Sequence, residues 1–205
     1  ALKLGENGDA DVVLVHARAL EDKFMAAGFG AVRKDVMYND FVIVGPTRDP
    51  AGVRGSKDVT AAMKKISASG AKFVSRGDES GTHQMEKDYW KSAGVAAQGA
   101  WYVSAGQGMG QVLTMAGQLE GYTLTDRATY AAYKDKTGLE TLVEGDPKMF
   151  NPYGIIAVSP QKHPAVNNNG AVALVNWMTA PEGQQAIAAF RINGVQMFFP
   201  GAGIR

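Results

Sequence analysis

Residues 75–83 read SRGDESGTH and combine a cation, two acids, hydroxyl side chains, two glycines and a histidine. The apolar run Ala71–Ser75 leads into this stretch and predicts a short strand. A helix follows it, because Met85 and Tyr89 stand one helical turn apart and Gly94 lies where a helix is expected to end. The stretch is therefore a turn from a strand into a helix.

The same order of strand, turn and helix occurs twice more along the chain. The run Ala100–Val103 precedes the turn Gly106–Gly108 and a helix with one apolar face. The run Tyr122–Leu124 precedes a helix for which Thr125 or Asp126 is the expected cap. Crossover connections keep one hand, so three successive helices start from one edge of one sheet. We therefore expect an α/β fold with mostly parallel strands and a ligand site at that edge.

Further apolar runs predict strands on both sides of this central region. They are Ala10–Val15, Asp40–Val44 and Tyr153–Val158, and we expect the remainder after the last run to be helical, with a helix that starts at Pro181. The helix before the central turn is expected to end at Gly70 in a left-handed cap.

The composition limits the class of protein. The chain has 205 residues, of which 45% are hydrophobic, and this is enough to bury a core. Lys and Arg number 21 against 20 Asp and Glu, so no overall charge attracts nucleic acid or another bulk polyanion. No apolar run approaches the ~20 residues of a membrane-spanning helix. The absence of cysteine excludes disulfides and thiolate metal sites.

One hypothesis for the central turn is a serine hydrolase that uses Ser80 as its nucleophile. Hydrolases of the α/β type place this serine in the pattern G-x-S-x-G, whereas here Gly77 precedes Ser80 by three residues instead of two. The base would be His83 in the same turn, or one of the distant residues His16 and His163. We expect His83 to lie exposed on the first turn of the helix.

Two other hypotheses use the charges of the turn. Arg76-Gly77-Asp78 matches an adhesion tripeptide, but three common residues often occur together by chance. A metal site would need Asp78, Glu79 and Glu86 to converge as oxygen ligands, and Arg76 in the same turn opposes a cation. Neither hypothesis accounts for the glycines and hydroxyl groups of the stretch.

An anion site accounts for more of these residues. The start of a helix presents unpaired backbone N–H groups and the positive end of the helix dipole. Gly81 allows close approach of the backbone, and Ser80 and Thr82 add hydroxyl groups. Arg76 adds a cation with a planar set of donors, and Asp78 is placed to hold it. From the residues alone, a helix cap with a local ion pair stays open as the alternative.

Several stretches together resemble one protein family. These are Ser75–Thr82 (SRGDESGT), Gly8–Ala17 (GDADVVLVHA), Tyr38–Pro46 (YNDFVIVGP), Gly106–Gly110 (GQGMG) and Asn151–Gly154 (NPYG). In this order they are similar to the periplasmic tungstate-binding proteins of bacterial ABC importers, over essentially the whole chain. The resemblance implies a two-lobed α/β fold of the type II periplasmic-binding-protein architecture. It also implies a protein that is not an enzyme and that closes on one tetrahedral oxyanion and passes it to a membrane permease.

The resemblance also implies a set of ligand residues and a division into lobes. Lobe I would be residues 1–45 and 152–205, and lobe II residues 46–151. Family members begin with a strand, a helix and a second strand that carry a Thr- and Ser-rich turn, and lobe I is expected to be incomplete at its N-terminus because residues 1–205 do not supply them. Either these elements lie before Ala1 or half of the ligand shell is absent. The ligand residues of lobe II would be Arg76, Ser80, Gly81 and Thr82, with Gln107 and Gly108 at the next helix start.

The implied ligand is tungstate, or molybdate, which has the same shape and charge. Sulfate and phosphate stay open as other tetrahedral oxyanions, and a proton on phosphate would call for an acceptor such as Asp78 or Glu79. No cofactor and no metal cation are expected. The implied partner is the permease subunit of an ABC transporter, with a monomeric protein in the periplasm or outside the cell. A lipid anchor on a leader that precedes this chain stays open.

Overall fold

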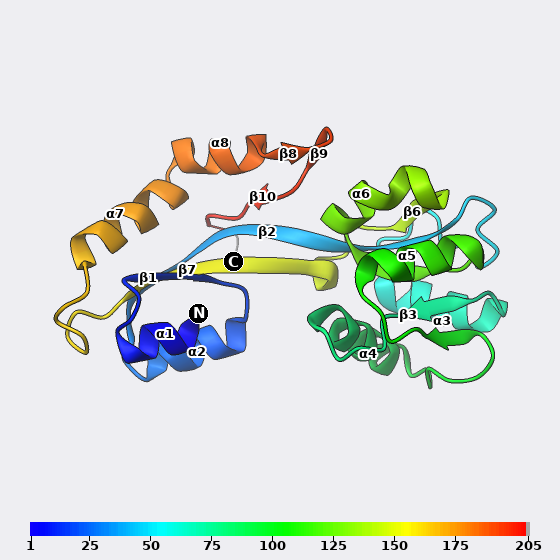
Figure 1. Ribbon diagram of the computed structural model, residues 1–205, viewed down its shortest axis with the longest axis horizontal. Helices are drawn as coiled ribbons and strands as arrows, with labels where there is room; N and C mark the ends of the chain where they lie inside the picture. The colour runs from blue at the N-terminus through cyan, green and yellow to red at the C-terminus, as the bar shows by residue number, and fades with distance from the viewer. Residues whose placement is uncertain (204–205) are drawn as a thin grey trace. The chain divides into compact units, whose positions relative to one another are not determined.

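The computed structural model describes residues 1–203, and the chain divides into two compact units. Unit 1 comprises Ala1–Asn39 and Asn151–Arg205, and unit 2 comprises Asp40–Phe150. Two strands, β2 (Gly30–Pro46) and β7 (Phe150–Val158), carry the chain from one unit to the other (Figure 1).

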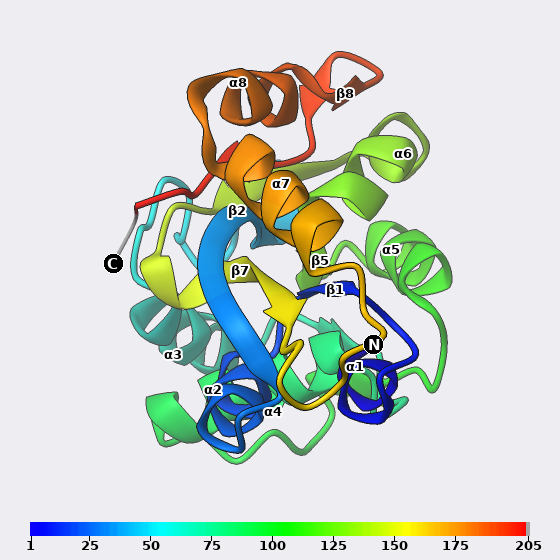
Figure 2. The ribbon, with the colours of Figure 1, turned by 90° about the vertical axis from the view of Figure 1, so that its left-hand side faces the viewer.

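Unit 1 is built on a sheet in the order β1-β7-β2-β10. Alternation along β7 divides its core, because successive side chains of a strand point to opposite faces. Ile156 packs with Phe24 of α2, whereas Ile155 packs with Val175 of α7. Figures 1 and 2 show α1 and α2 on one side of the sheet and α7 and α8 on the other. The remaining elements of this unit are α1 (Leu2–Asn7), β1 (Val12–Val15), α2 (Arg18–Ala26), α7 (Asn168–Thr179), α8 (Pro181–Ala189), β8 (Arg191–Ile192), β9 (Val195–Gln196) and β10 (Phe199–Pro200).

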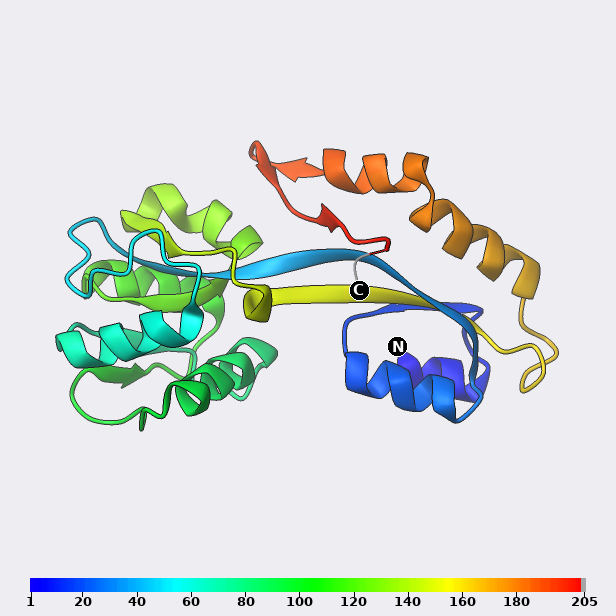
Figure 3. The same ribbon diagram turned by 180° about the vertical axis from the view of Figure 1, so that it is seen from behind.

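Unit 2 is a sheet with helices on both faces. Along β2, Ile43 packs into the core on the side of α3 and α4, whereas Val42 and Val44 pack on the side of α5 and α6. Figures 1 and 3 show this arrangement, in which α5 and α6 cover one face. The elements are α3 (Val59–Ser69), β3 (Phe73–Ser75), α4 (Gly81–Ala93), β4 (Tyr102–Ser104), α5 (Met109–Gln118), β5 (Thr123–Asp126), α6 (Arg127–Thr137), β6 (Leu139–Val143) and a 3₁₀ helix (Pro147–Met149).

The α/β class is confirmed, but the expectation of mostly parallel strands is wrong. Strands β3 and β4 are parallel, and a parallel bridge places β5 beside β3. Strand β2 runs antiparallel to β5 and to β6. The reason is that β2 enters unit 2 beside the end of β5, with Phe41 opposite Asp126 and Val44 opposite Thr123. The same pairing places the division of the chain at Asn39 and Asp40, several residues before the boundary at 45/46.

Candidate functional site

Three strands of unit 2 end at the edge of the sheet where three helices begin. Strands β3, β4 and β5 lead into α4, α5 and α6, as the sequence predicts. The caps of these helices differ in charge. Ser80 Oγ accepts a hydrogen bond from the N–H of His83 at 3.2 Å, whereas Asp126 caps α6 with a carboxylate. Gly108 caps α5 without any side-chain hydrogen bond. The starts of α4 and α5 are therefore the two that lack an acidic cap.

The turns before α4 and α5 are joined to each other through their backbones. Ser75 and Ser104 are paired at the ends of β3 and β4. Beyond them, the N–H of Ala105 donates to the carbonyl of Ser75 at 3.0 Å, and the N–H of Gln107 donates to the carbonyl of Arg76 at 3.1 Å. The structure thus places the two groups of predicted ligand residues on neighbouring turns of one unit.

Arg76 is held by Asp78. The Nε and Nη2 atoms of Arg76 donate to Oδ2 of Asp78 at 3.1 and 2.6 Å, and Oδ1 of Asp78 accepts the N–H of Ser80 at 3.2 Å. Partial burial raises the pKa of Asp78, but hydrogen bonds from Ser80 and Arg76 and the charge of Arg76 outweigh it and lower the pKa to about 2. Within residues 1–203, Nη1 of Arg76 has no hydrogen-bond partner. Both hydrogens of Nη1 are therefore free to donate.

The predicted residues around Arg76 offer space and further donors. Gly81 and Gly108 have no heavy atom within 4 Å of the position that a Cβ would occupy. In the part of the chain that the structure describes, the hydroxyl of Thr82 and the side-chain amide of Gln107 have no hydrogen-bond partner. The first N–H groups of α4 and α5 have no partner within their helices. These groups can surround a small anion with neutral donors beside one cation.

The prediction that His83 lies exposed is wrong. Its side chain is 10% exposed, and its Nδ1 accepts the N–H of Glu79 at 3.0 Å. This bond holds Glu79 in a left-handed conformation with a φ of 57°. The carboxylate of Glu79 pairs with Lys87 at 2.8 Å, which lowers the pKa of Glu79. The buried ring of His83 therefore supports the turn.

The hydrogen bonds of Ser80 and His83 do not support the serine hydrolase hypothesis. Ser80 Oγ accepts the backbone N–H of His83, and the ring of His83 is engaged by Glu79. Within residues 1–203, no histidine ring is hydrogen-bonded to Ser80 Oγ. The adhesion hypothesis is also poorly supported, because Arg76 and Asp78 bind each other.

The hydrogen-bond network of Glu86, which was considered above only as a metal ligand, was not predicted from the sequence. Glu86 of α4 is 2% exposed and accepts hydrogen bonds from Ser75, Tyr102 and Trp90. Burial raises the pKa of Tyr102, and the adjacent carboxylate of Glu86 contributes in the same direction. The sequence holds a signal for this residue, since Glu86 lies four positions before Trp90 on the buried stripe of α4.

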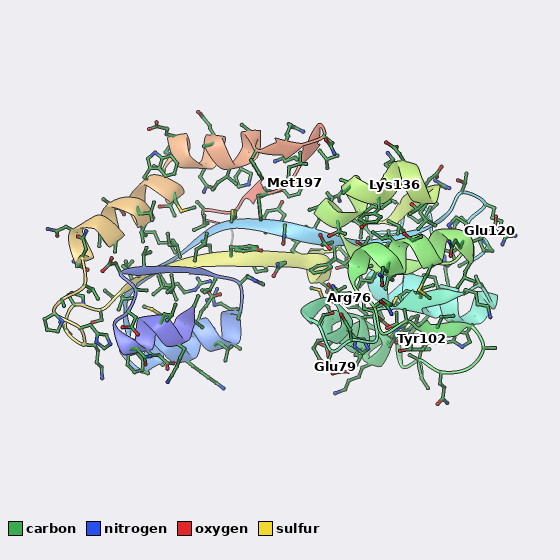
Figure 4. All side chains as sticks on the ribbon, viewed as in Figure 1. Arg76, Glu79, Tyr102, Glu120, Lys136 and Met197 are labelled. Atoms are coloured by element: carbon green, nitrogen blue, oxygen red, sulfur yellow. The ribbon has the colours of Figure 1, made fainter. Side chains whose placement is uncertain are left out.

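Figure 4 labels Arg76, Glu79 and Tyr102 of the candidate site and Glu120 elsewhere in unit 2. Arg76 and Glu79 lie at one end of the unit, and Glu120 lies at the opposite end. Strands β3, β4 and β5 end at the same edge, and Asp126 at the end of β5 pairs with Phe41 of β2. Both turns of the candidate site therefore lie at the end of unit 2 where β2 enters it.

The family described as the PBP superfamily domain matches residues 1–182. The chain belongs to the PBP superfamily and, within it, to the family of TupA. The relatives include a protein of Haloferax volcanii named as a candidate ABC transporter anion-binding protein, with 48% identity over 98% of this chain. The tungstate-binding protein TupA of Peptoclostridium acidaminophilum is 46% identical over 98% of the chain. The chain spans 60% of the length of the first relative and 72% of the second.

A solved structure supports the same family. The tungstate-binding protein TupA of Desulfovibrio alaskensis G20 superposes with a TM-score of 0.93 and 49% identity, covering 98% of this chain and 83% of that one. These matches confirm the periplasmic-binding-protein family and the α/β fold that the resemblance implies. In residues 1–203, no helix has the length and apolar character needed to cross a membrane.

Proposed function

We propose that this protein binds tungstate, with molybdate as a second ligand, and delivers it to the permease of an ABC importer. The names of the TupA relatives support the ligand. The observation that carries the proposal is the pair of neighbouring helix starts, α4 and α5, beside a guanidinium that Asp78 holds and that keeps free donors. The ligand residues in this proposal are Arg76, Ser80, Gly81, Thr82, Gln107 and Gly108.

The chemistry of the donors suits a dianion. A doubly charged oxyanion that leaves water needs a hydrogen bond to each oxygen and some compensating charge. Helix N–H groups and hydroxyls supply the hydrogen bonds, and Arg76 supplies the compensating charge. Because Asp78 already carries one negative charge beside Arg76, most of the stabilisation must come from neutral donors. The proposal requires no cofactor, no metal cation and no catalytic step, and it places a monomeric protein in the periplasm or outside the cell.

The geometry favours fully ionised oxyanions over hydrogen phosphate. A protonated phosphate oxygen must donate its hydrogen to an acceptor. Both carboxylate oxygens of Asp78 already accept hydrogen bonds, and the carboxylate of Glu79 is paired with Lys87. Sulfate has no such proton and is the more serious competitor, so it belongs in every binding measurement.

Calorimetric titration with tungstate tests the proposal. We expect Arg76→Ala to weaken binding by about 100-fold or more, since removing a charged partner in a closed site costs about 2–5 kcal/mol. The matched control is Arg48→Ala, which removes an arginine that pairs with Glu120 at the other end of unit 2. Binding in the control should equal that of the unchanged protein. Equal affinity in the Arg76 variant would remove that residue from the site, and no tungstate binding by the unchanged protein would refute the function.

A further inference from the structure

A buried carboxylate lies in α4 next to the turn that carries Arg76, and the proposed anion binding does not itself use it. Oε2 of Glu86 accepts a hydrogen bond from Ser75 Oγ at 2.6 Å. Oε1 accepts from the hydroxyl of Tyr102 at 2.7 Å and from Nε1 of Trp90 at 2.9 Å. These three donors belong to β3, β4 and α4. One carboxylate therefore joins the three elements that meet at the candidate site.

Ser75 transmits this anchoring to both turns. Its side chain is buried, and its Oγ accepts the N–H of Gly77 at 3.2 Å while its hydrogen points to Glu86. Its carbonyl accepts the N–H of Ala105, which begins the turn before α5. Gly77 has a φ of 59° and leaves no room for a side chain against Ser104. The position of Ser75 thus sets the path of the backbone on either side of Arg76.

The cost of this arrangement points to a role beyond packing. A carboxylate buried away from water is unfavourable unless hydrogen bonds replace its hydration. Within residues 1–203, Glu86 forms no ion pair and depends on three neutral donors. Those donors fix its orientation, and an apolar side chain in its place would leave the hydrogens of Ser75, Tyr102 and Trp90 without an acceptor.

We propose that Glu86 is a positioning residue for the anion site. It orients Ser75, and through Ser75 it holds the two turns that present Arg76 and the start of α5. This inference rests on the proposed function. A site whose donors are held before the ligand arrives loses less conformational freedom on binding, so loosening Ser75 should weaken affinity even in a fully folded protein.

The variant Glu86→Gln tests the inference, because glutamine keeps the size of the side chain. Its amide can present an oxygen to Tyr102 and Trp90, but then an NH₂ group faces Ser75 in place of the acceptor. We expect tungstate to bind roughly tenfold or more weakly, as the loss of a hydrogen bond to a charged group implies. The number of tungstate ions bound per protein, measured well below the unfolding temperature, should equal that of the unchanged protein, because the variant remains folded.

A double-mutant cycle separates positioning from general stability. Ser75→Ala should weaken tungstate binding to a similar degree, and the double variant should bind no more weakly than either single variant, because both changes break the same connection. The matched control is Tyr89→Phe, which removes a partly buried hydrogen bond of α4, from the hydroxyl to the carbonyl of Lys148 at 2.8 Å. This control should lower the unfolding temperature and leave the dissociation constant unchanged.

Three outcomes would overturn the inference. The first is wild-type affinity in Glu86→Gln, and the second is fully additive losses in the cycle. The third is a loss of affinity in Tyr89→Phe as large as that in Glu86→Gln, which would reduce the effect to stability alone. If Glu86→Gln does not fold, Ser75→Ala carries the same expectation, and wild-type affinity there overturns the inference. If the unchanged protein binds no tungstate, the proposed function fails, and the inference fails with it.

Discussion

Asp78 is the residue on which the local electrostatics of the turn depend. It accepts two hydrogen bonds from Arg76 and one from the backbone of Ser80, so it fixes both the cation and the residue before α4. It also cancels the formal charge of Arg76, which means that a dianion there is not held by net charge. Selectivity then depends on the number and direction of neutral donors, because these distinguish anions by shape and protonation.

The lowered pKa of Asp78 predicts how stability depends on pH. Its pKa falls from an ordinary value of 3.8 to about 2, so its contribution to folding is fully present above pH 3.8 and is lost as the pH falls toward 2. Asp78→Asn removes this titration. We expect the free energy of unfolding of the unchanged protein to fall more steeply between pH 4 and pH 2 than that of the variant.

Urea unfolding of both proteins, without tungstate, measures this difference. Other carboxylates whose pKa values are lowered, such as Asp49 and Glu140, titrate in both proteins and cancel in the comparison. The difference in unfolding free energy between the two proteins should shrink as the pH falls. If the unfolding free energies of the two proteins fall in parallel as the pH is lowered, Arg76 and Ser80 do not hold Asp78 in solution.

Single residues whose role is local could be predicted from the sequence. Gly70 and Gly94 end their helices with φ values of 73° and 67°, and Asp126 caps α6, as expected. These roles follow from backbone conformation and short-range hydrogen bonds. The burial of His83 and the network of Glu86 could not be derived in this way, because their partners come from the fold around the helix.

The start of α5 offers a test in which stability and binding move in opposite directions. Gly108 has a φ of −68°, which any residue adopts, and there is open space where its side chain would be. Gly108→Asp gives the helix an acidic cap, which should leave stability unchanged or raise it by a few tenths of a kcal/mol. It also places a negative charge at the proposed oxyanion position, so tungstate affinity should fall at least tenfold.

The matched control for this change is Gly108→Ser, which caps the helix without a charge. It should stabilise the protein to a similar degree and keep tungstate affinity within a few-fold of the unchanged protein. Thermal unfolding and calorimetry on the same samples give both quantities. If Gly108→Asp binds tungstate as well as the serine variant does, the start of α5 does not face the anion.

Elements with a clear period could be predicted, and short or paired elements less so. The start of α8 at Pro181 is confirmed, but the expectation that the segment after Val158 is helical misses β8, β9 and β10. Between β8 and β9, Asn193 and Gly194 have φ values of 51° and 77°, as an Asn-Gly hairpin turn requires. The Asn193-Gly194 dipeptide is the feature of the sequence that could have predicted this hairpin. Strands of two residues have no period of their own, so the turn is what reveals them.

At the scale of the whole molecule, the fold class could be predicted but the exact division of the chain could not. The family resemblance implies a boundary at 45/46, next to Gly45-Pro46, where a strand is expected to end. In the structure β2 continues to Pro46, and its residues from Phe41 onward pair within unit 2. A strand that serves two units reads as one apolar run, so the point of division depends on pairing partners far away in sequence.

Ligand binding should raise the stability of the whole molecule. A ligand that binds only the folded state adds a stabilisation that grows with the logarithm of its concentration, about 2.7 kcal/mol at 100 times the dissociation constant. For a chain of this length, that corresponds to a rise in unfolding temperature of roughly 5–10 °C. We expect this rise with tungstate, a smaller one with molybdate, and a rise of about 1 °C or less in Arg76→Ala at the same concentration.

Sulfate at equal concentration distinguishes this linkage from a general salt effect. Sulfate stabilises folded proteins by exclusion from their surface, but only when it is concentrated, whereas a specific site saturates at low concentration. The unfolding temperature should therefore rise linearly with the logarithm of tungstate concentration above the dissociation constant and stay flat for sulfate over the same range. Equal slopes for the two anions would show that the donors around Arg76 select for charge and shape without distinguishing the larger oxyanion.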